Sequence, residues 1–153
     1  MILSLTCEQA DILSNALHHL GFDQSISDTE RILCHCLTER VTFEPSNFPH
    51  PQSPPPLILD TEQKKLVIKA FLREYSLFCE DYEMTEEEIY DIVEEINEIE
   101  NAISSGNSFR LFEERLKQLK TKLGDKQKTL NEIYVKPLGD YMALADKLKD
   151  EKL

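Results

Sequence analysis

The fold of this protein is decided by residues 85–103, which read TEEEIYDIVEEINEIENAI. Isoleucine recurs there at steps of three and four residues, at positions 89, 92, 96, 99 and 103. This alternation places the isoleucines along one side of a helix and is typical of a helix that packs against another helix. Thr85 and Glu88 have the spacing of a capping box, so we expect the helix to begin at Thr85.

A second apolar heptad follows the polar turn SSGNS at 104–108. Its apolar positions are Phe109, Phe112, Leu116, Leu119, Leu123, Leu130 and Ile133. Lys126 interrupts this pattern. Because so short a turn joins the two heptads, we expect an antiparallel, coiled-coil-like hairpin. Counting outward from the turn pairs Ile103 with Phe109, Ile96 with Leu116, and Ile89 with Leu123.

The segments on either side of the hairpin also have helical patterns. A helix is expected from Asp60 or Thr61 to about Glu80, and apolar residues cover most of its circumference, which is typical of the central helix of a bundle. One hairpin cannot cover that surface, so a second layer must bury it. The N-terminal hairpin and the last helix can supply that layer within the same chain; otherwise a second copy supplies it, and of the two we favour a homodimer. After the start of the second heptad, Gly124 is expected to kink or end the helix and Pro137 is expected to disturb it. A last helix is expected over 140–149.

The N-terminal part predicts a pair of short helices within residues 6–40. Thr6 with Gln9, and Ser27 with Glu30, have capping-box spacing, and Gly21 suits the end of the first helix. Residues 1–5 can form a short extended segment. Six of the seven prolines lie in 41–59, which excludes a helix there. The apolar residues of this proline-rich strap predict that much of it is held against a helical surface.

The sequence therefore predicts an all-α protein with three parts. These are an N-terminal helical hairpin at 1–40, a proline-rich strap or linker at 41–59, and a C-terminal helical bundle at 60–153 whose centre is the antiparallel hairpin.

Charge is distributed very unevenly along the 153 residues. The formal net charge is −12, and residues 80–100 contain eleven acidic residues and no basic residue. The opposing helix of the predicted hairpin is basic, so one interpretation is that the charges pair across the hairpin and set its orientation. Its seven basic residues between 110 and 128 cannot neutralise all eleven acids. The surplus must face water or a basic partner.

Several classes of function lack support in the sequence. There is no apolar run long enough to span a membrane, and the acidic composition disfavours direct binding to nucleic acid. No motif of a nucleotide-binding, metalloprotease or hydrolase site is present, and no Glu precedes a His by three residues. We therefore predict no catalytic residue, no cofactor and no metal site.

The cysteines and histidines are interpreted as structural or surface residues. The start of the chain lacks the features of a signal peptide, so free thiols in the cytoplasm are expected rather than disulfides. Cys36 lies on the predicted apolar face of its helix and is expected in the core, whereas Cys34 is expected to be exposed. His18 and His19 lie in the last turn before Gly21, where a positive charge suits a helix C-terminus.

The function that this pattern favours is a non-catalytic protein–protein interaction module, such as an adaptor, chaperone or regulatory subunit. Its partner is expected to have a basic surface. The predicted partner-binding residues are Glu80, Asp81, Glu83, Glu87, Asp91, Glu94 and Glu98. One alternative is an acidic inhibitor that mimics nucleic acid and blocks a DNA- or RNA-binding protein. A third hypothesis is a small metal protein or enzyme.

Overall fold

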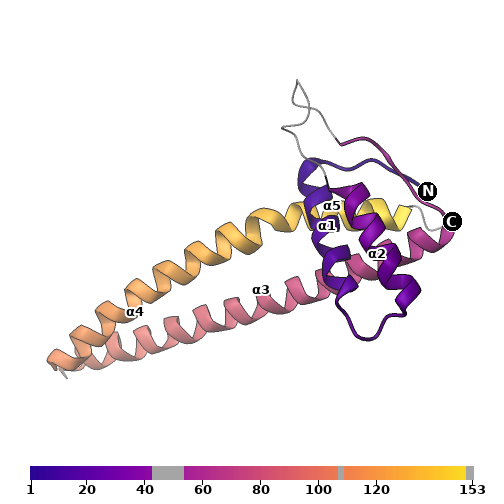
Figure 1. Ribbon diagram of the computed structural model, residues 1–153. Coiled ribbons are helices and arrows are strands. Elements are labelled where there is room, and N and C mark those ends of the chain that lie inside the picture. The colour runs from indigo at the N-terminus through magenta and orange to yellow at the C-terminus, as the bar shows by residue number, and fades with distance from the viewer. Residues whose placement is uncertain (43–53, 107–108, 151–153) are drawn as a thin grey trace. The chain divides into compact units, whose positions relative to one another are not determined.

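The computed structural model describes residues 1–42, 54–106 and 109–150. These residues form an all-α protein, as predicted, with one minimal two-stranded ribbon (Figure 1). The elements in chain order are β1 (Ile2–Leu3), α1 (Cys7–Gly21), α2 (Asp28–Val41), β2 (Leu57–Ile58), α3 (Thr61–Ser104), α4 (Arg110–Thr129), the π-helix η2 (Leu130–Val135) and α5 (Lys136–Asp150).

The helix starts in the N-terminal half are set by side-chain caps. Thr6 and Gln9 form a capping box at α1, and Ser27 and Glu30 form one at α2, both as predicted. In each box the hydroxyl accepts from the backbone N–H three residues on, which satisfies a donor that the helix leaves unpaired. Asp60 accepts from the N–H of Gln63 in the same way at the start of α3.

The chain is organised as two compact units. Unit 1 comprises 1–77 and 138–153, and unit 2 comprises 78–137. These limits fall at other positions than the predicted 1–40, 41–59 and 60–153. The difference arises because the beginning of α3 and the C-terminal helix share their apolar core with α1 and α2.

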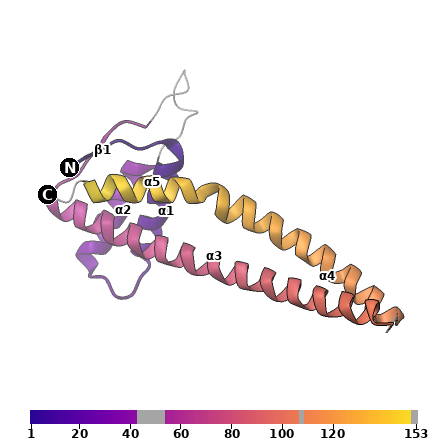
Figure 2. The ribbon, with the colours of Figure 1, turned by 180° about the vertical axis from the view of Figure 1, so that it is seen from behind.

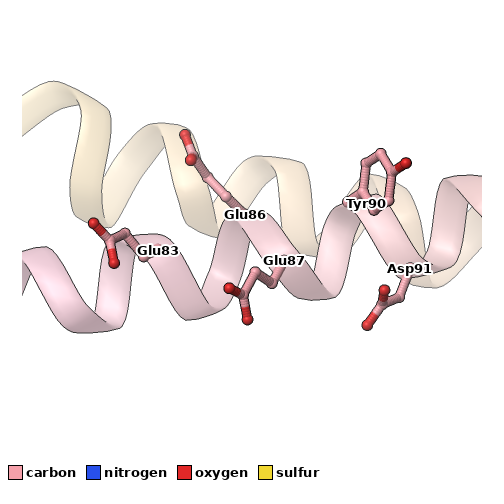
Figure 3. Close-up of a pocket in the computed structure, with 5 residues that line it drawn as sticks. All are labelled: Glu83, Glu86, Glu87, Tyr90 and Asp91. Carbon is pink, nitrogen blue, oxygen red and sulfur yellow. The ribbon is translucent and has the colours of Figure 1, made fainter.

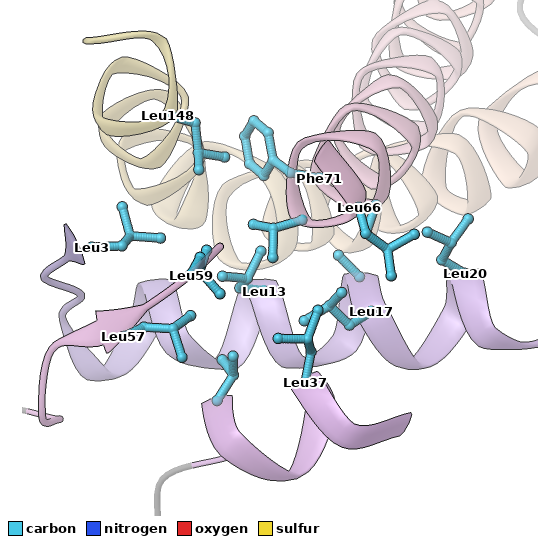
Figure 4. Packing of buried hydrophobic residues seen from close by; sticks show 14 of the residues in the cluster. Leu3, Leu13, Leu17, Leu20, Leu37, Leu57, Leu59, Leu66, Phe71 and Leu148 are labelled. Atoms are coloured by element: carbon cyan, nitrogen blue, oxygen red, sulfur yellow. The ribbon is translucent and has the colours of Figure 1, made fainter. Parts of the chain in front are cut away.

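Unit 1 has a core to which nearly all its elements contribute (Figure 4). The side chains of Leu13 and Leu17 from α1, Leu37 from α2 and Phe71 from α3 are almost completely buried there. α5 adds a further leucine, Leu144. The homodimer was predicted because this surface of α3 needed a cover, and within unit 1 the chain itself covers much of it. Self-association remains a prediction.

The short β-ribbon attaches the chain segment after the prolines to the N-terminus. β1 and β2 pair antiparallel, with Ile2 opposite Ile58 and Leu3 opposite Leu57, and β1 is marked in Figure 2. Because side chains alternate between the two faces of a ribbon, Leu3 and Leu57 enter the core while Ile2 and Ile58 are exposed. The end of the proline-rich strap is thus held in place. The strap residues 43–53 lie outside the described residues.

The predicted boundary between two helices at residues 80–85 is wrong, because α3 continues without interruption from Thr61 to Ser104. No glycine or proline occurs in this range, so nothing in the backbone chemistry forces a break. Thr85 does not cap a helix start; its hydroxyl donates instead to the carbonyl of Asp81 within the helix.

Unit 2 contains a pair of helices with an isoleucine and leucine seam. Ile92 and Ile96 of α3 and Leu119 of α4 are buried together. Leu116, the predicted partner of Ile96, packs against this cluster but is only partly buried. Two predicted seam positions are wrong, because Phe109 is 60% exposed and Ile133 is 55% exposed.

The helical path continues past Gly124, where a kink or an end was predicted, and is disturbed just before Pro137, as predicted. The turns just before Pro137 widen into η2, in which the N–H of Lys136 donates to the carbonyl of Asn131, five residues back. In an α-helix the proline ring would clash with the carbonyl of Ile133, four residues back. We attribute the π-helix to the relief of that clash. In the part of the chain that the structure describes, no helix combines the length and apolar character needed to cross a membrane.

Candidate functional site

The predicted partner-binding residues all lie on α3 within unit 2, and all seven are exposed. Six of them follow one another at helical spacing and form a single stripe: Glu80, Glu83, Glu87, Asp91, Glu94 and Glu98. We call this stripe the acidic face. The seventh, Asp81, is turned about 100° away from Glu80 around the helix axis.

The acidic face lies on the side of α3 that is turned away from α4. Glu94 is two positions from each of the buried residues Ile92 and Ile96, which corresponds to about 200° around the helix axis. The isoleucine seam therefore determines where the stripe points. When the seam packs against α4, the acidic face is presented to solvent.

Other acids of the same helix are paired with α4. Glu95 accepts from Arg115 at 3.0 Å and Glu100 pairs with Lys120 at 3.3 Å. Glu88 accepts from Lys126, and this hydrogen bond lowers the pKa of the Glu88 carboxyl. Pairing across the hairpin, the first interpretation of the acidic segment, thus applies to these three acids.

The predicted residues differ from those three acids in their surroundings. Among the described residues, no ion pair includes any of the seven. Unit 2 as a whole contains fifteen acidic and eight basic residues, a net charge of −7. The exposed surface of α3 therefore has a concentrated negative potential. It lies beside acids of the same helix whose charge is neutralised by α4.

The middle of the acidic face borders an open recess (Figure 3). Its lining residues are Glu83, Glu86, Glu87, Tyr90 and Asp91. In the view of Figure 3, Glu86 and Tyr90 extend on the side of the second helix, whereas Glu87 and Asp91 point away from it. The recess thus joins the acidic face to the flank of the helix pair.

Tyr90 was missed by the sequence reasoning although it is 63% exposed. The neighbouring Glu94 carboxylate, as a hydrogen-bond acceptor and as a negative charge, raises the pKa of Tyr90. The ring adds a flat apolar surface beside the carboxylates. Its place was readable from the heptad, because Tyr90 lies one residue from a seam isoleucine on the outward side.

The chemistry available at this face is that of charged acceptors. Carboxylates in water can accept hydrogen bonds from lysine, arginine or backbone N–H groups. Within the described residues, no three His, Cys, Asp or Glu side chains are grouped so as to hold a metal ion.

The remaining sequence candidates lie in unit 1. His19 contacts both carboxylate oxygens of Glu74, at 3.0 and 3.2 Å from Nδ1. The expectation for the two cysteines of α2 is wrong: Cys34 is buried and Cys36 is exposed. The reason is the close approach of α1 and α2, where a Cβ added at Gly21 would lie 3.7 Å from Cβ of Cys34.

Comparison with protein-family models, with curated proteins and with solved structures gives no match for this chain.

Proposed function

We propose that this protein is a non-catalytic interaction module whose acidic face binds a basic surface of another protein. An adaptor, chaperone or regulatory subunit fits this description. The observation that carries the proposal is the contrast within one helix. Glu88, Glu95 and Glu100 pair with α4, while the acidic face is exposed and has no ion pair among the described residues.

The energetics of α3 support a role in binding rather than in folding. Like charges four residues apart, such as Glu83 and Glu87 or Glu87 and Asp91, destabilise a helix by about 0.2–0.5 kcal/mol per pair. A basic partner would relieve this repulsion. Clustered charge on a helical surface also accelerates association with a surface of opposite sign.

A second copy of unit 2 is a poor candidate for the basic surface. Its own net charge is −7, so bringing two copies together along their acidic faces would add repulsion. The lysines of α4 that form no ion pair with α3 among the described residues, such as Lys117 and Lys128, are too few to neutralise the stripe. We therefore place the basic surface on a different protein.

The test is affinity capture from the source cell with three forms of the full chain. The first is the wild type. The second carries Glu87→Gln, Asp91→Asn, Glu94→Gln and Glu98→Gln, which removes four charges from the acidic face. The third is a matched control with Asp11→Asn, Glu39→Gln, Glu132→Gln and Asp146→Asn, which removes four exposed charges elsewhere.

We expect the wild type and the control to capture the same basic protein at low salt and to lose it at high salt. The acidic-face variant should fail to capture this protein at either salt concentration. Its thermal stability should equal or exceed that of the wild type. Retention of the partner by the acidic-face variant at low salt would contradict the proposal. A captured nuclease or polymerase that DNA or RNA displaces would favour the nucleic-acid mimic instead.

A further inference from the structure

The two flanks of the helix pair in unit 2 differ in the ion pairs that connect α3 to α4. Seven residues correspond to two helical turns of a heptad, so Glu88 and Glu95 lie on one flank of the seam. Both are paired with cations of α4, and the recess beneath them has the buried residues Ile92 and Leu119 in its lining. Ion pairs thus bridge the two helices along this flank and occupy its charged side chains.

The opposite flank of α3 contains Glu86, Val93 and Glu100, again seven residues apart. Of these, Glu100 pairs with Lys120 of α4. The residues on the Lys120 side of α4 therefore belong to the same flank of the helix pair. Val93, the middle position, is an apolar side chain that is only partly buried. We call this side the Val93 flank.

Open apolar surface on the Val93 flank comes from both helices. On α3, Tyr90 is 63% exposed beside Val93 and borders the recess of Figure 3. On α4, Leu116 is partly buried and lines a second recess together with Lys120. A pair of helices that leaves its seam half covered on one side can accept a third helix there.

The charged residues that border this surface differ between the two helices. On the α3 side, Glu83, Glu86 and Glu87 line the recess that contains Tyr90, and no ion pair among the described residues includes them. A bound helix would therefore face these carboxylates along its α3 edge and apolar side chains along its centre, and Lys117 and Lys120 along its α4 edge.

We propose that the Val93 flank binds an amphipathic helix of the partner protein, whose apolar stripe packs on Tyr90, Val93 and Leu116. Lysine or arginine residues beside that stripe pair with Glu83, Glu86 and Glu87. This inference rests on the proposed function and specifies the element by which the basic partner binds. Charge complementarity selects a basic helix over a second copy of this chain, because unit 2 as a whole has a net charge of −7 although its α4 is basic.

The probe is a fluorescent synthetic helix of about 21 residues, with leucine at the two seam positions of each heptad, lysine at the flanking positions and glutamine elsewhere. A second peptide of equal charge has glutamine in place of leucine. Anisotropy titrations at low salt give the affinity of the full-length chain for each peptide. We expect the leucine peptide to bind at least tenfold more tightly than the equal-charge peptide.

Two variants locate the binding surface. The first carries Tyr90→Gln and Val93→Gln. The second is a control that carries Met84→Gln and Leu111→Gln, which removes two exposed apolar side chains from the opposite side of the helix pair. The first variant should lose at least tenfold in affinity for the leucine peptide and the control should lose less than twofold. Circular-dichroism melting curves check that both variants fold.

The other outcomes distinguish failure of this inference from failure of the proposed function. Equal binding of the two peptides, or equal losses in the two variants, would show that charge alone attracts the probe, which overturns the inference and leaves the proposed function standing. Failure of both peptides to bind at low salt would overturn the proposed function too. A dimer in sedimentation equilibrium that the Tyr90 and Val93 variant reduces to 17.7 kDa would assign the flank to a second copy.

Discussion

At the scale of single residues, Cys34 and Cys36 have opposite environments on α2. Cys34 is 0% exposed and belongs to the core of unit 1, and burial raises the pKa of its thiol. Cys36 is exposed. Two residues correspond to about 200° around a helix, so these two side chains must point in opposite directions. The packing of α1 against α2 then decides which of them is covered.

Alkylation should distinguish the two thiols. We expect iodoacetamide at neutral pH to modify Cys36 at least ten times faster than Cys34, because the thiolate is the reactive form and Cys34 is both buried and held protonated. Peptide mass spectrometry after timed quenching measures the two rates. In denaturant the rates should converge. Comparable rates in the folded protein would mean that Cys34 is accessible and that the α1–α2 contact is wrong.

At the scale of the element, two leucines of α4 differ strongly in how deeply they are buried. Leu119 is 1% exposed and packs with Ile92 and Ile96. Leu111, eight residues earlier on the same helix, is 76% exposed. The two positions therefore form a matched pair for testing the packing of α4, since residue type and helix are identical.

Replacing Leu119 by alanine should lower the free energy of unfolding by about 2–4 kcal/mol, because it removes buried methyl groups and leaves a cavity. The same change at Leu111 should stay within about 0.5 kcal/mol. Urea unfolding followed by circular dichroism measures both. Equal effects at the two positions would show that α4 packs through another face.

At the scale of the whole molecule, the two units differ in the size of their cores. The core of unit 1 draws on α1, α2, α3, α5 and the β-ribbon, whereas the core of unit 2 is a single seam between two helices. Apolar burial is the main source of stability, so the local opening free energy should differ between the units.

Hydrogen exchange along α3 should reveal this difference within one helix. We expect the backbone amides of 66–71, which lie in unit 1, to exchange at least about tenfold more slowly than those of 89–99 in unit 2. Mass spectrometry of proteolytic fragments after timed labelling gives both rates. Uniform exchange along the helix would instead indicate that the described structure opens as one cooperative unit.

Much of the local structure was predictable because it depends on spacing along the chain. The capping boxes at Thr6 and Ser27, the isoleucine seam and the exposure of the predicted acidic residues follow from 3.6 residues per turn. The break expected at Thr85 failed because a cap-like spacing cannot end a helix that contains no breaker. The binding role of the acidic face stays a prediction.

By itself, the sequence determined the all-α class, the position of the seam and the concentration of negative charge on α3, since each depends on residue order alone. Only the tertiary structure decided which cysteine is buried, which acids pair with α4, and that the chain after the prolines forms a ribbon with the N-terminus. Periodicity gives the direction of a side chain around its own helix axis. It does not give the neighbour that lies in that direction, because the neighbour comes from a distant part of the chain and is selected by packing.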